Sequence, residues 1–160
     1  MAQGAHGLSL LFQTIGPAEG SPGASNPAAH LAEALQPTAG VGPLILHYAW
    51  VVELTGKFPP IYPIDSKIAI RTFLLTTVYD EDFADYIADL VAANPEAFNA
   101  AAASILGLQN LIPVQTPENL PKFIQFVLDH DLNNGGNNPS FFEAYPQSVL
   151  EILQAFPPAS

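Results

Sequence analysis

Residues 42–54 read Gly-Pro-Leu-Ile-Leu-His-Tyr-Ala-Trp-Val-Val-Glu-Leu and contain Trp50, the only tryptophan of the chain. Drawn as a helix, this stretch has almost no polar face. A helix that is apolar all round is typical of one buried at the centre of a domain. Pro43 near its start and Gly56 after its end suit the two ends of a helix. The stretch therefore predicts a central helix around which the rest of the chain packs.

Further short helices are expected on both sides of this stretch, because Asn or Thr followed by Pro recurs where apolar residues begin to repeat at helical spacing. The expected helices span residues 27–36, 80–93 and 94–108, and two more begin near Thr116 and Pro139. Residues 1–25 are rich in Gly, Ala and Pro and predict a flexible arm, in which apolar residues 8–15 could dock onto the core or onto a partner. The predicted fold is all-α, with residues 26–160 forming one irregular domain of six or seven short helices joined by Pro-rich turns.

Residues 67–79 fit two secondary structures. The β-branched residues of this stretch favour a strand, namely Ile68, Ile70, Thr72, Thr76, Thr77 and Val78. Its length and the preceding Asp65-Ser66, which can cap a helix, favour a helix. A helix is expected, because no second strand candidate is identified to pair with it.

The net charge excludes several classes of function. Four Lys and Arg face 15 Asp and Glu, which gives a net charge of −11. Binding to nucleic acid or to an anionic membrane surface depends on Lys and Arg, so neither is expected. No segment approaches the about 18 uninterrupted apolar residues of a membrane span, and a soluble protein is expected. The chain has no Cys, which excludes disulfides and thiolate chemistry and leaves the cellular compartment open.

One group of side chains could line a ligand pocket. On a helix, His47 shares a face with Trp50, and a buried imidazole near a carboxylate of residues 80–89 could act as a general base. The alternative is a core histidine bonded to a backbone carbonyl. The predicted ligand-binding residues are His47, Tyr48, Trp50, Phe73 and Tyr79.

Charged side chains offer a second candidate site. Lys67 and Arg71 are one turn apart on a helix and could contact an anionic group, or they could pair with some of the many acids. Asp82, Asp85 and Asp89 share one helix face, which is expected to be solvated rather than a cation site.

Residues 129–136 resemble part of a calcium-binding loop. Side chains with oxygen ligands alternate at Asp129, Asp131 and Asn133. The sixth position is Asn134 instead of Gly and the twelfth is Ser140 instead of Glu, which excludes an EF-hand. A weak, irregular calcium site at the three alternating residues is left as a prediction, with a plain turn as the alternative.

The leading functional hypothesis is a non-enzymatic protein that acts through protein–protein contacts or self-association, as an accessory subunit, adaptor or self-assembling component. It rests on 49% hydrophobic residues in a small chain, more apolar surface than one such domain easily buries. The alternative is a small-molecule binder or cofactor-free enzyme with an apolar pocket around His47 and Trp50. No nucleotide-binding, nucleophile-elbow or zinc motif is present, and no cofactor is expected.

Overall fold

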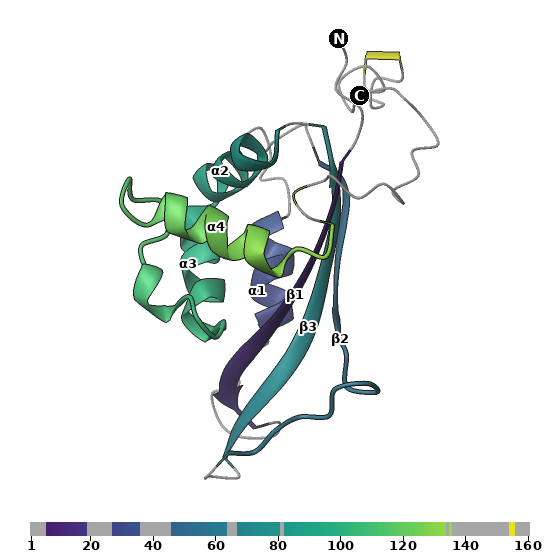
Figure 1. The fold of residues 1–160 in the computed structure, drawn as a ribbon, viewed down its shortest axis with the longest axis vertical. Coiled ribbons are helices and arrows are strands. Elements are labelled where there is room, and N and C mark those ends of the chain that lie inside the picture. The colour runs from purple at the N-terminus through teal and green to yellow at the C-terminus, as the bar shows by residue number, and fades with distance from the viewer. Residues whose placement is uncertain are drawn as a thin grey trace.

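A three-stranded antiparallel sheet stands where the sequence predicts a central helix (Figure 1). The structure is a computed structural model, and it describes residues 6–18, 27–35, 46–63, 67–80, 82–133, 135 and 154–155. The elements in chain order are β1 (His6–Pro17), α1 (Pro27–Leu35), β2 (Leu46–Glu53), β3 (Ile68–Tyr79), α2 (Phe83–Ala93), α3 (Pro95–Ser104), the 3-10 turn η1 (Gln109–Leu111) and α4 (Leu120–His130). The all-α prediction is therefore wrong, and the fold combines a sheet with helices.

The prediction failed at the stretch that was expected to organise the fold. Residues 46–53 form strand β2, and Trp50, expected at the centre of the core, is 52% exposed on this edge strand. The periodicity of a short apolar run does not distinguish a buried helix from a strand, so its secondary structure depends on whether another segment can pair with it. Residues 68–79, the ambiguous stretch, form the central strand β3 and supply the pairing partner.

Strand β3 pairs with both other strands, in the order β1-β3-β2. The β1–β3 register runs without interruption from His6↔Tyr79 to Pro17↔Ile68. Because β1 and β2 both run antiparallel to β3, they are parallel to each other, and the connection between them includes α1. Residues 6–17 of the predicted flexible arm are thus an integral strand, and the apolar segment 8–15 docks onto the core by pairing with β3.

The helix starts were read more successfully than the strands. Helix α1 begins at Pro27 as predicted. Helix α2 begins at Phe83, three residues after the predicted start, and is capped by Asp82, whose carboxylate accepts a hydrogen bond from the Ala84 amide at 3.1 Å. Helix α3 is capped by Asn94, as predicted. The helix expected from Pro139 lies outside the described residues.

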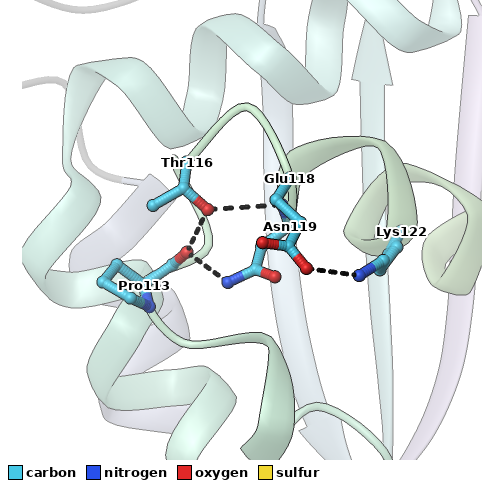
Figure 2. A network of polar contacts seen from close by, with 5 residues as sticks. All are labelled: Pro113, Thr116, Glu118, Asn119 and Lys122. Atoms are coloured by element: carbon cyan, nitrogen blue, oxygen red, sulfur yellow. Dashed lines mark hydrogen bonds and ion pairs between the residues drawn. The ribbon is translucent and has the colours of Figure 1, made fainter.

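The loop before α4 is tied together by side chains (Figure 2). The Thr116 hydroxyl donates to the Pro113 carbonyl at 3.2 Å and accepts from the Asn119 amide at 3.2 Å. The Asn119 side chain donates to the same carbonyl at 3.0 Å, and Lys122 forms an ion pair with Glu118 at 3.2 Å. Thr116 therefore caps a turn that leads into the helix, and α4 begins four residues later than the predicted start.

The four described α-helices lie on one side of the sheet in Figure 1, and the apolar core fills the space between them. Every second residue of β1 and of β3 points into this core. Its largest fully buried side chains include Leu8 of β1, Phe73 and Tyr79 of β3, Tyr86 of α2, and Leu108 after α3. The free edge of β1 is closed by the segments that follow α3 and α4. The Leu106 amide donates to the Gln13 carbonyl at 2.8 Å, and the Leu132 amide donates to the Ser9 carbonyl at 2.9 Å.

Candidate functional site

The second face of the sheet is the main feature that the helices leave uncovered. Paired residues of an antiparallel sheet point to the same side, so the register defines this face. We call it the outer face, and its residues are Ser9, Leu11, Gln13 and Ile15 of β1, Trp50 and Val52 of β2, and Ile68, Ile70, Thr72, Leu74, Thr76 and Val78 of β3. Ile61 extends it, because Ile61 forms a bridge with Ile70.

The outer face is uncharged and mostly apolar, with Ser9, Gln13, Thr72 and Thr76 as its polar residues. None of the twelve residues that define it is ionisable, although the chain carries 15 Asp and Glu. Several of its large side chains lie open to solvent: Trp50 at 52%, Ile61 at 54% and Ile68 at 39%. An antiparallel sheet with one solvated face normally alternates apolar and polar residues. This sheet carries Leu, Ile and Val on both faces, which is typical of a sheet with other structure packed against each of its two faces.

One edge of the sheet has no paired strand among the described residues. Strand β2 lies at the end of the order β1-β3-β2, and no described residue pairs with its far side. Exposed edges of natural sheets are usually protected by Lys, Pro or bulges. Strand β2 contains neither Lys nor Pro, and its one irregularity is a register shift between Leu46 and Tyr48.

A groove of about 280 Å³ lies at the β1 edge of the sheet, and Leu11, Gln13 and Thr72 of the outer face form part of its lining. Its described lining residues are Leu11, Phe12, Gln13, Phe58, Thr72, Leu106 and His130. The Nδ1 atom of His130 lies 2.8 Å from the Phe126 carbonyl oxygen, and the two rings stack with centroids 4.0 Å apart. Because a carbonyl can only accept, Nδ1 carries the proton, and Nε2 of the neutral ring is the atom that can accept a further hydrogen bond.

The predicted ligand-binding residues are not brought into one pocket. Trp50 is opposite Thr76 on the outer face, whereas Phe73 and Tyr79 are buried on the helix-covered face. The side chains of His47 and Tyr48 lie outside the described residues. A sheet therefore separates Trp50 from two of the side chains with which it was grouped.

The core offers little room for a substrate. Between the sheet and the helices is an enclosed apolar cavity of about 40 Å³, whose lining includes Thr77 and Tyr86. Ligand sites usually measure about 300 Å³ or more. The described core thus gives no support to a buried small-molecule site.

The predicted anion-contact residues are set apart by the strand. Arg71 lies on β3 and Lys67 directly precedes this strand, so about 13 Å of extended chain separates the two residues instead of one helical turn. Arg71 instead approaches Glu53, with Nε 3.8 Å from Oε1.

The three predicted calcium ligands each have a hydrogen-bond partner within the protein. Asp131 accepts from the backbone amides of Ser9 at 2.9 Å, Asn133 at 3.0 Å and Gly135 at 2.7 Å. The Asn133 side chain donates to the Ser9 hydroxyl at 2.9 Å. Asp129 accepts from the Gln125 side chain at 2.7 Å. This arrangement ties the end of α4 to β1, and the calcium site remains a prediction.

The described ranges contain neither a metal-binding cluster nor a membrane-spanning helix. No group of three or more His, Asp or Glu side chains in this part of the chain is placed to hold a metal ion. None of its helices has the length and apolar character to cross a membrane.

Sequence reasoning missed the outer face because it treated residues 67–79 as a helix. The missed signal is the alternation within this stretch. Every second residue from Ile68 to Val78 is uncharged, and Lys67 and Arg71 both fall in the other set. As a strand, the stretch therefore has one face without any charge. Comparisons of the chain with protein-family models, with curated proteins and with solved structures find no match, so a function has to be argued from the outer face and its groove.

Proposed function

We propose that this protein is a non-enzymatic, self-assembling component, and that two copies associate by packing their outer faces against each other. The carrying observation is a sheet face that is uncharged and mostly apolar, with the large side chains of Trp50, Ile61 and Ile68 open to solvent in a single copy. Two sheets packed face to face bury their inner side chains in a layer about 10 Å thick, as in a β-sandwich. The second copy would supply the cover that the helices supply on the other side.

Charge supports a second copy over a basic partner. A net charge of −11 makes two copies of this chain repel each other, and acids buried in the contact surface would add like-charge pairs to that repulsion. The outer face meets that condition, because all twelve of its residues are uncharged. A basic partner would be held by acidic side chains, and this face has none. In a two-fold symmetric dimer the same surface patch of both copies forms the interface, so an uncharged apolar patch can pack against its own copy without a partner of opposite charge.

The size of the face is also suitable. Strands of 12, 12 and 8 residues, at about 3.3 Å per residue and about 4.8 Å between strands, span about 500 Å² of flat sheet. Side chains roughen this plane, which brings the accessible surface toward the roughly 800 Å² that each partner buries in a standard interface. Trp50 is the residue type that most often dominates such interfaces.

The test uses the fluorescence of the single Trp together with sedimentation velocity over a range of protein concentrations. We expect a monomer–dimer equilibrium, with a blue shift of Trp50 emission and weaker acrylamide quenching as the dimer forms. Thr76→Lys places a charge in the middle of the outer face, where the lysine can reach water only in the monomer. Leaving an unpaired charge in an interface costs several kcal/mol, so this variant should dimerise at least about a hundredfold more weakly.

Ala100→Lys is the matched control, because it changes the net charge equally at an exposed position of α3. This variant should dimerise like the wild type. A wild-type chain that stays monomeric at all concentrations would refute the proposal. If Thr76→Lys dimerises as strongly as the wild type, the outer face is not the interface and the proposed packing is refuted; the edge of β2 would be the next surface to test.

A further inference from the structure

The outer face carries both a projecting aromatic side chain and a hollow, and the two lie on opposite sides of it. Trp50 is on the edge strand β2 and is 52% exposed. The groove of about 280 Å³ lies beside β1, at the other edge. Within the described part of the chain, the groove is an empty space and the side chain of Trp50 is half exposed.

The two features match in chemistry. The indole of Trp50 is an apolar body with one N–H donor and no acceptor. Leu11, Phe58 and Leu106 give the groove apolar walls. The neutral His130 ring offers the lining an acceptor, because Nδ1 lies 2.8 Å from the Phe126 carbonyl oxygen and a proton on Nδ1 leaves Nε2 with a lone pair. A buried indole usually finds a hydrogen-bond partner, and this groove has one to offer.

The two features also match in position. When two copies face each other across a two-fold axis that runs roughly along the strands, β2 of one copy lies over β1 of the other. Trp50 is level with Ser9 through their shared partner Thr76, and the groove is level with Phe12, three residues further along β1. Three residues of strand measure about 10 Å. The length of the indole side chain, together with the crossing angle of about 30° between aligned sheets, can cover this offset.

We propose that Trp50 of each copy inserts into the groove of the other, so that the dimer contains two identical tryptophan-in-groove contacts. This inference rests on the proposed face-to-face association and names the residues that hold it together. The groove is then a receptor for a second copy of this chain, and His130 accepts the indole hydrogen bond there.

Two variants each remove one half of this contact. Trp50→Ala removes the projecting side chain. Gln13→Arg places a long charged side chain at the mouth of the groove from an exposed position, where it should not disturb folding. Each variant alone has no intact contact in its own dimer, and each should associate at least about thirtyfold more weakly than the wild type.

A mixture of the two variants gives the decisive measurement. In the mixed dimer, Trp50 of the Gln13→Arg copy meets the unaltered groove of the Trp50→Ala copy, so one contact is restored. The Gln13→Arg copy carries the only tryptophan in the mixture, and its emission reports this event directly. We expect a blue shift when Trp50→Ala is added. Adding the double variant with both substitutions should give no shift, because it has no open groove.

Each outcome separates this inference from the proposed function. If the wild type dimerises but Trp50→Ala dimerises equally well, the face-to-face association stands and the tryptophan contact is refuted. The same holds if both variants are weakened and their mixture shows no restored association. If the wild type is a monomer, both proposals are refuted. Circular dichroism of each variant checks that the fold is retained.

Discussion

Two stacked tyrosines in the core should respond to the same substitution with opposite signs. Tyr79 and Tyr86 are both fully buried, with ring centroids 3.9 Å apart and planes inclined by 4°. The Tyr86 hydroxyl donates to the Thr77 hydroxyl at 2.8 Å. The Tyr79 hydroxyl has no hydrogen-bond partner among the described residues, although it is shielded from solvent. The pair therefore contains one satisfied and one unsatisfied buried hydroxyl.

The size of each effect follows from this difference. A buried hydroxyl without a partner costs about 1–3 kcal/mol. Tyr79→Phe removes this cost and leaves a space of about 10–15 Å³, which costs about 0.3 kcal/mol at the usual penalty for cavities. The free energy of unfolding should therefore rise by about 1 kcal/mol. Tyr86→Phe breaks a hydrogen bond and leaves the buried Thr77 oxygen without this donor, so it should lower the free energy of unfolding by about 1–2 kcal/mol.

Urea unfolding followed by Trp50 fluorescence measures both changes, at a protein concentration low enough to keep the chain monomeric. The slope of the free energy against urea should be the same for each variant, because the surface exposed on unfolding is unchanged. Tyr62→Phe is the control, since Tyr62 is 53% exposed and its hydroxyl can bond to water. A loss of stability in Tyr79→Phe as large as that in Tyr86→Phe would refute the reasoning, because it would mean that the Tyr79 hydroxyl is satisfied in the folded protein.

Three further predictions concern stability. Burial raises the pKa of Tyr79 and of Tyr86, so both keep their protons in the folded state at a pH where the unfolded chain releases them, above about pH 10. The free energy of unfolding should therefore be constant below that pH and fall above it by up to about 1.4 kcal/mol per pH unit for each tyrosine. Urea titrations at several alkaline pH values should show that the free energy of unfolding of Tyr79→Phe falls less steeply with pH. Asp131→Ala removes the acceptor of three backbone amides and should lower the free energy of unfolding by about 3 kcal/mol, with faster amide hydrogen exchange in β1. Unchanged exchange in β1 would contradict the role of Asp131 in holding the end of α4 to this strand. Gly107→Ala should cost about 1–2 kcal/mol in a urea titration, because this glycine has a φ of 95° and an added Cβ would lie 3.0 Å from an aromatic ring atom, whereas Gly56→Ala, with open space around it, should be neutral or slightly stabilising.

The sequence alone identified several parts of this protein correctly. Helix α1 begins at Pro27 as predicted, and Asn94 caps the helix that starts at Pro95. These signals are local, because a cap depends on the amides of the next turn and a proline on its own ring. The ambiguity of residues 67–79 was also recognised from their β-branched side chains. The candidate sites rest on helical or loop spacing. Because the chain forms strands there, Trp50 is separated from Phe73 and Tyr79, and Lys67 is separated from Arg71.

Only the tertiary structure decided that three apolar stretches pair as strands. Taken alone, residues 8–15 predict part of a flexible arm, and residues 42–54 and 67–79 each predict a helix. A strand exists only when another strand satisfies its backbone donors and acceptors, and β3 does so for both β1 and β2 across many residues of sequence. The same pairing sets which side chains share a face, so it moved Trp50 from the expected core to an exposed edge. Local sequence carries the information for a helix cap, but a sheet, and the surface that it presents to a partner, is a property of segments that meet only in the folded chain.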